Sequence, residues 1–234
     1  ADASSVGQVS MWRDACEAWG RVMTLDTSRR GENLYLACLA RGKLLVKVAE
    51  SLAAAEEHTT PGHGVAKASA PQTVAEAIQL AEESFQEVTR LHHEWGHPPL
   101  DRDGWCTWGE LAALQMRLAI DDLDARGASD CRDFDFVQGL CKSGSDRFAA
   151  AISAGAATHE EEEEEEAADG VDPTGDSSDG RCLTLHAELL LAFVGFVVEA
   201  LLRGARRCMG PPLPLQSWAR AAEESWTEAA RLAD

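Results

Sequence analysis

The five residues Ala81-Glu82-Glu83-Ser84-Phe85 return near the end of the sequence as Ala222-Glu223-Glu224-Ser225-Trp226. In both places a Glu follows two residues after the aromatic side chain, and Arg-Leu follows it at five and six residues. The first small residue and the aromatic residue four positions later lie on the same face of an α-helix. The repeated pattern therefore predicts two helices that pack against neighbours in the same way.

A wider trio of residues occurs four times: a small residue, an aromatic residue four positions later, and a small or aliphatic residue three positions after that. Small residues let a neighbouring helix approach, and the aromatic ring fills the space beside it, as stacked helix pairs require. We expect the first two members of each trio to be the packing residues of a helical repeat. The trios are Ala15, Trp19 and Val22; Ala81, Phe85 and Val88; Gly144, Phe148 and Ala151; and Ala222, Trp226 and Ala229.

Apolar residues three and four positions apart run through most of the chain, and alternating, strand-like segments are almost missing. This period predicts an all-α protein with helices over residues 10–25, 33–56, 73–96, 107–126, 134–154, 182–207 and 215–233. Residues that stop helices lie between them, at Pro61-Gly62, Pro98-Pro99, Gly127 and Gly210-Pro211-Pro212.

Two helix starts carry the capping-box pattern, in which Ser or Thr is followed three residues later by Glu. The pairs are Thr73 with Glu76 and Thr107 with Glu110. We therefore expect one helix to begin directly after Thr73 and another directly after Thr107.

A second kind of helix alternates with the trios. Its residues Leu36, Leu39, Ala40 and Lys43 have the spacing of Trp108, Leu111, Ala112 and Gln115, and a degenerate third copy is His186, Leu189, Leu190 and Phe193. This alternation resembles the tetratricopeptide repeat, whose first helix carries Trp, Leu, Gly and Tyr at those spacings and whose second helix carries the trio. The resemblance implies antiparallel helix pairs stacked into an α-solenoid, and a generic helical bundle is the alternative.

An acidic tract interrupts the helical pattern between residues 156 and 181. It contains eleven carboxylates and no Lys or Arg between the first and the last of them, and such mutual repulsion with low hydrophobicity predicts a disordered loop. The loop would separate repeats at 1–155 from a final helix pair of the same domain at 182–234. It is either a solubilising linker or an arm that binds a basic partner, through Glu160, Glu161, Glu162, Glu163, Glu164, Glu165, Glu166 and Asp169.

The overall composition limits the partners. The sequence has 21 Lys and Arg residues against 40 Asp and Glu, a formal charge of −19, which disfavours direct binding to nucleic acid and favours a basic protein. The cysteines are scattered and odd in number, 7 in all, as is typical of reduced, buried thiols in an intracellular protein. The longest apolar run, 189–198, is shorter than the roughly 20 residues that a membrane span needs, so we expect a buried helix of a soluble protein.

The residues Arg41-Gly42-Lys43-Leu44-Leu45 and Val48-Ala49-Glu50 lie within the stretch 15–52. This stretch resembles the first helix of the second repeat in the nuclear autoantigenic sperm protein family of histone chaperones. That family combines interrupted tetratricopeptide repeats with an acidic insertion, binds histones and escorts them to chromatin. The resemblance implies a histone client.

One motif points to an enzyme instead. His93-Glu94-Trp95-Gly96-His97 matches the H-E-x-x-H pattern, in which two His on one helical face bind zinc and the Glu activates water. Gly96 and Pro98-Pro99 are expected to end the helix inside the motif. Glycine-rich phosphate loops and nucleophile elbows are missing from the sequence, so we expect no catalytic residues, no metal and no cofactor.

Together these observations favour a non-catalytic protein, a nuclear or cytoplasmic histone chaperone that holds a basic client in a helical groove and against the acidic tract. A general tetratricopeptide scaffold or co-chaperone adaptor is the alternative, and a metallopeptidase is the third possibility. The local basic cluster of Arg41, Lys43 and Lys47 is small for a clamp that grips an acidic peptide, which favours the chaperone over the adaptor.

Overall fold

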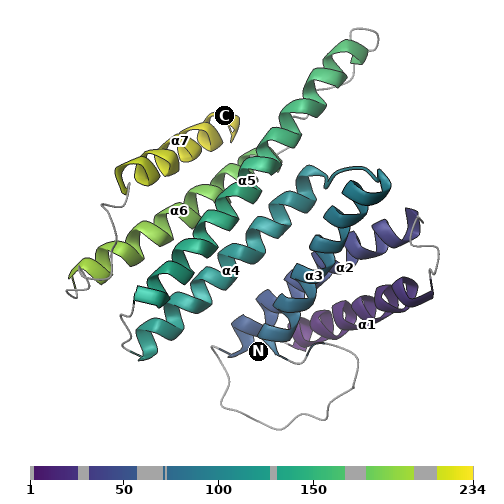
Figure 1. The fold of residues 1–234 in the computed structure, drawn as a ribbon, viewed down its shortest axis with the longest axis horizontal. Helices are drawn as coiled ribbons and strands as arrows, with labels where there is room; N and C mark the ends of the chain where they lie inside the picture. The colour runs from purple at the N-terminus through teal and green to yellow at the C-terminus, as the bar shows by residue number, and fades with distance from the viewer. Residues whose placement is uncertain are drawn as a thin grey trace. The chain divides into compact units, whose positions relative to one another are not determined.

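The computed structural model describes residues 3–25, 32–56, 71, 73–126, 131–166, 178–202 and 215–233. Over these ranges the chain forms seven α-helices and no strand, so the all-α prediction is confirmed (Figure 1). The helices are α1 (Ala3–Leu25), α2 (Glu32–Glu56), α3 (Val74–Trp95), α4 (Arg102–Arg126), α5 (Cys131–Glu166), α6 (Ser178–Leu202) and α7 (Leu215–Ala233).

The chain divides into two compact units, Ala1–Leu100 with helices α1 to α3 and Asp101–Asp234 with helices α4 to α7. The boundary follows Pro98-Pro99, which end the helical path of α3 because proline cannot continue it. The sequence-based division was drawn instead around the acidic tract, and it kept helices of both units within residues 1–155.

In the first unit, α2 packs against both α1 and α3. Apolar side chains of α2 such as Leu45 and Val46 are buried, as are Phe85 and Val88 of α3. The Tyr35 hydroxyl donates a hydrogen bond of 3.1 Å to the Pro99 carbonyl oxygen. This bond ties the start of α2 to the segment that follows α3.

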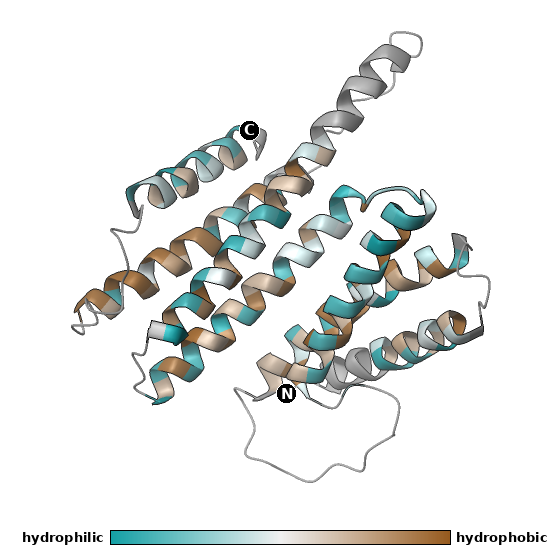
Figure 2. Cartoon of the chain, in the orientation of Figure 1, coloured by the Kyte–Doolittle hydropathy of each residue, from teal (hydrophilic) through white to brown (hydrophobic). Residues whose placement is uncertain are grey.

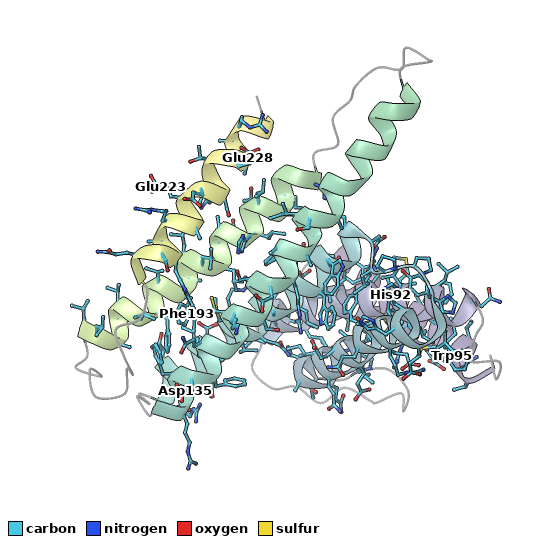
Figure 3. The ribbon with its side chains drawn as sticks, turned by 45° about the horizontal axis from the view of Figure 1, so that its top comes forward. His92, Trp95, Asp135, Phe193, Glu223 and Glu228 are labelled. Atoms are coloured by element: carbon cyan, nitrogen blue, oxygen red, sulfur yellow. The ribbon has the colours of Figure 1, made fainter. Side chains whose placement is uncertain are left out.

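In the second unit, α5 packs against α4 and α6, and α6 also packs against α4 and α7. Phe193 of α6 is fully buried at the centre of this core. Figure 3 labels this residue on α6. Its ring centroid lies 6.1 Å from that of Phe134 on α5 and 4.4 Å from that of Trp218 on α7. One aromatic side chain therefore connects three helices.

The two predicted helix starts have different outcomes. Thr73 forms the capping box, because its side chain accepts a 3.1 Å hydrogen bond from the Glu76 backbone and its own N–H donates to the Glu76 carboxylate at 3.3 Å. The prediction for Thr107 is wrong: α4 begins at Arg102, and Thr107 is a buried residue inside the helix. Asp101 caps α4 instead, since its Oδ1 accepts a 2.7 Å hydrogen bond from the Gly104 N–H.

Helix α5 is longer than expected. It has 36 residues, against 25 each in α4 and α6, and its backbone continues through 160–166, where we predicted a disordered loop. Glutamate has a high helix propensity, and an existing helix grows without a new nucleation step, which explains the extension. Asp169 and the rest of 167–177 lie outside the described residues.

Candidate functional site

The predicted packing residues occupy different environments. Phe85 and Phe148 are fully buried, with Ala81 and Ala222. Gly144 is also buried, whereas Ala15 and Trp19 are only partly covered. Trp226 is 42% exposed and does not fill a gap between helices as its counterparts do. The residue before it on α7, Ser225, is buried instead.

Close backbone contacts accompany the buried phenylalanines. A Cβ atom on Gly42 of α2 would lie 3.1 Å from the Phe85 ring of α3, and one on Gly109 of α4 would lie 2.7 Å from the Phe148 ring of α5. A glycine of one helix thus lies against an aromatic residue of the next helix in both units. The sequence patterns identified the aromatic residues but not these two glycines.

Gly144 of α5 makes a further close approach within the second unit. A Cβ atom there would lie 3.2 Å from the Ala112 Cβ of α4 and 2.7 Å from the Leu189 Cδ2 of α6. Gly144 and Ala112 are the small residues that the repeat pattern placed on facing helices. The missing side chain lets α4 and α6 both approach α5.

The His186 side chain occupies a polar site inside this packing. Its Nε2 lies 2.8 Å from Ser145 Oγ on α5, and its Nδ1 lies 3.2 Å from Ser225 Oγ on α7. Burial lowers the pKa of His186, which favours the neutral ring that can donate one of these bonds and accept the other. The Phe148 ring lies 5.9 Å away, so the His186 side chain takes part in the packing of α5, α6 and α7.

The H-E-x-x-H motif does not lie on a continuous helix. Helix α3 ends at Trp95, and Gly96 has a left-handed conformation with φ of 69°, so His93 and His97 belong to different local structures (Figure 3 labels Trp95). Glu94 pairs with Arg90, and the His97 ring stacks on Tyr35 with centroids 5.6 Å apart. The residues of the motif thus form the C-terminal end of α3 and the segment that follows it.

Helix α6 has two apolar faces. One face packs into the core through residues such as Leu189, Phe193 and Val197. The opposite face exposes Leu191, Ala192, Gly195, Val198 and Leu202, and Figure 2 shows hydrophobic residues over much of α6. We call these five exposed residues the α6 stripe.

The buried helix expected at 189–198 is therefore only half buried. By length and composition alone, Gly180–Leu202 is apolar enough to cross a membrane, but its inner face packs against α4, α5 and α7. A helix that is apolar all round has a second surface to cover, and this signal could have identified the stripe from sequence.

The C-terminal part of α5 carries the acidic segment. Glu160–Glu166 continue the helix beyond Gly155, which lies close to Arg102 of α4. Figure 1 shows this part of α5 extending past α4 and α6. Exposed Glu188 and Glu199 of α6 lie beside the stripe, so apolar and acidic surfaces occur in the same unit.

Comparisons with protein-family models, with curated proteins and with solved structures gave no match to this chain.

Proposed function

We propose that this chain is a non-catalytic binding protein of the histone-chaperone type, which holds a basic, partly helical protein client on its second unit. The observation that carries the proposal is the extension of α5, which places a run of seven glutamates on a helix beyond the helices that pack against it.

The charge of the client follows from the acidic segment. A helix rises 1.5 Å per residue, so the seven glutamates of the run 160–166 follow one another over about 10 Å of helix backbone. Such a field attracts cationic segments over roughly one Debye length, about 10 Å at 0.1 M salt. Histones have long basic segments, and neutralising them prevents premature contact with nucleic acid.

The shape of the client follows from the α6 stripe. Leu191, Val198 and Leu202 recur at helical spacing on an exposed face, which suits an amphipathic helix laid along it. Glu188 and Glu199 beside the stripe favour a client helix whose apolar face has basic residues along its edges. Apolar burial would supply affinity that persists when salt screens the charges.

The repeated packing of glycine against phenylalanine supports the finer proposal of tetratricopeptide-like helix pairs. Gly42 with Phe85 and Gly109 with Phe148 place α2 on α3 and α4 on α5 in the same manner. Repeats of this kind serve as scaffolds for protein ligands. The alternative is a scaffold or adaptor for an uncharged client. Such a client would bind through the α6 stripe and would make no use of the acidic segment.

The test is a titration of the purified full chain with core histones and with lysozyme as a basic control protein, over a salt series. One variant replaces Glu160–Glu166 by Gln, which keeps a good helix former, and a second carries Leu191→Gln and Val198→Gln. Phe136→Gln is the matched control, because Phe136 is an exposed apolar residue of the same unit outside the stripe.

We expect histones to bind more tightly than lysozyme at about 0.15 M salt, where charge alone is partly screened. The glutamine run should lower histone affinity most at low salt, the stripe variant should lower it at every salt concentration, and Phe136→Gln should leave it unchanged. Equal affinity for histones and lysozyme would overturn the histone proposal. Loss of affinity in the stripe variant alone would favour the uncharged-client scaffold.

A further inference from the structure

Glycines inside the two helical units receive large side chains from neighbouring helices. In each case the missing Cβ leaves a hollow between the surrounding residues of the helix, and an apolar side chain of the next helix lies in it. This is the knob-and-hole contact by which helices pack closely. The pairs are Phe85 on Gly42, Phe148 on Gly109 and Leu189 on Gly144.

Gly195 of α6 has the same hollow on an exposed face. Its four neighbours on the helix surface are the residues three and four positions away, and three of these are apolar, Leu191, Ala192 and Val198, with Glu199 as the fourth. All four are exposed. A Cβ atom on Gly195 would meet no atom of the described residues within 4 Å. We call Gly195 with these four neighbours the α6 socket.

Other exposed glycines do not have such surroundings. Gly139 of α5 is also exposed, and a Cβ atom there would likewise meet nothing within 4 Å among the residues that the structure describes. Its neighbours four positions before and three positions after are the charged residues Asp135 and Lys142. A large apolar side chain placed on Gly139 would therefore lie among charges, whereas one placed on Gly195 would lie mainly among apolar groups.

Carboxylates lie to one side of the socket. Glu188 and Glu199 are eleven residues apart, which is three helical turns to within about 20°, and both are exposed. At 3.6 residues per turn they lie to one side of Gly195, while the large apolar residues of the stripe, Leu191, Val198 and Leu202, lie to the other. A helix laid along the stripe would therefore meet negative charge along one edge only.

This charge distribution decides between two possible occupants. The sequence has no Lys or Arg between residues 182 and 202, so a second copy of α6 would bring only further carboxylates to that edge over this length. The net charge of −19 also opposes the approach of a second chain. A helix with Lys or Arg beside its apolar face is complementary to the same edge.

We propose that the α6 socket binds an amphipathic helix that places one large apolar side chain, Leu or Phe, over Gly195 and has Lys or Arg along the edge facing Glu188 and Glu199. The apolar side chain would contact Leu191 and Val198, as the buried phenylalanines contact their own sockets. This inference rests on the proposed function, because it names the kind of helix that the α6 stripe of that proposal would bind.

The first test titrates the full chain with three alanine-based peptides of about 20 residues, long enough to form helix in water. The reference peptide has a central Phe, Leu about one turn to either side, and Lys along one edge of this face. The second peptide has Ala in place of Phe, and the third has Glu in place of Lys. By fluorescence anisotropy we expect the reference peptide to bind about tenfold or more tightly than either.

The second test fills the socket without harming the fold. Gly195→Leu replaces a poor helix former by a good one, and its Cβ meets no described atom. Gly139→Leu is the matched control, because it makes the same exchange on an exposed face of α5. Gly195→Leu should weaken the reference peptide about tenfold, as overpacking does, and should remove the preference for Phe over Ala. Gly139→Leu should change neither, and circular dichroism verifies that both variants are folded.

Tighter binding by Gly195→Leu would show that the stripe is a general apolar surface without a socket, and it would overturn the proposal. Equal binding of the three peptides would do the same, and the proposed function would still stand if histones bound through the stripe. Peptides that rank as expected, with histones binding no better than lysozyme, would support the socket and overturn the histone client. Dimerisation of the free chain that Gly195→Leu abolishes, measured by sedimentation, would identify a second copy as the occupant instead.

Discussion

A Cβ atom on Gly109 would lie 2.7 Å from Cε1 of Phe148. Real side chains essentially never approach this closely, so the α4 backbone and the fully buried Phe148 ring depend on the absence of a side chain at residue 109. The corresponding approach of Gly42 to Phe85 is 3.1 Å, which is less restrictive.

We predict that Gly109→Ala destabilises the second unit by about 1–3 kcal/mol, because the new methyl group would have to displace the fully buried Phe148 ring. The higher helix propensity of alanine, worth up to about 1 kcal/mol, acts against this loss. Gly139→Ala on α5 is the control: its Cβ would meet nothing within 4 Å, and it should stabilise the protein. Urea unfolding of the three proteins measures both effects, and a stabilising Gly109→Ala would contradict the close packing.

The stability should fall as the pH is lowered through the range in which His186 titrates. Burial lowers the pKa of folded His186 below the value of about 6.5 that an unfolded His has. Below pH 6.5 the unfolded chain therefore binds a proton that the folded chain does not, and unfolding becomes more favourable. The contribution of His186 is complete above pH 6.5 and is lost as the pH falls toward its folded pKa.

The variant His186→Gln isolates this effect, because it lacks the titrating ring while other groups are unchanged. We expect the unfolding free energy of the unsubstituted chain to exceed that of the variant most at pH 7.5, and the difference to shrink by pH 5. A difference that is constant over this range, measured by urea unfolding, would contradict a neutral His186 in the folded protein.

Substitution of Glu110 and substitution of Arg181, which form an ion pair, should lower the free energy of unfolding by different amounts. The Glu110 side chain is 6% exposed, whereas Arg181 is half exposed. Arg181→Gln leaves a buried carboxylate without this cation and should cost about 1–3 kcal/mol. Glu110→Gln leaves a solvated guanidinium and should cost less.

Arg126→Gln provides the comparison for that experiment, because its ion pair with Asp122 lies on the surface. Surface pairs contribute about 0–1 kcal/mol, so this variant should remain close to the unsubstituted protein. Thermal or urea unfolding measures the loss of unfolding free energy in each variant. Equal losses for Arg181→Gln and Arg126→Gln would show that burial of Glu110 has no effect.

Asp101→Ala should destabilise α4 by about 1 kcal/mol, since it removes the hydrogen bond to the Gly104 N–H. Thr73→Ala should have a similar effect on α3 through the capping box. Far-ultraviolet circular dichroism during urea unfolding measures both losses. If Asp101→Ala had no effect while Thr73→Ala did, the assignment of Asp101 as the cap of α4 would be wrong.

The sequence predicted helical structure well where a local signal was decisive. Three signals predicted the bounds of α3: the helical period of apolar residues, the helix stop at Pro98-Pro99 and the capping box at Thr73. The predicted range of 73–96 is close to the observed Val74–Trp95. The Thr107 pattern failed because a capping pattern also occurs inside helices, where the hydroxyl can bond to its own backbone: Thr107 Oγ1 donates to the Asp103 carbonyl oxygen at 2.8 Å.

Features that depend on contacts between helices could be predicted less well from the sequence. The trio at Ala222 and Trp226 has the same spacing as the trio at Ala81 and Phe85, but spacing does not fix which neighbour a helix faces, and Trp226 is exposed. The hydrogen bonds of His186 to Ser145 and Ser225 likewise join residues with no common local pattern. These contacts follow from packing, which a single sequence does not encode locally.

The stripe on α6 also determines how the free protein behaves as a colloid. An exposed apolar helix face promotes self-association, and the charge of −19 opposes it by keeping copies of the chain apart. That repulsion weakens in high salt and vanishes near the isoelectric point of 4.7. The tendency of copies of the chain to associate through the stripe therefore depends on the surplus of carboxylates over the whole sequence.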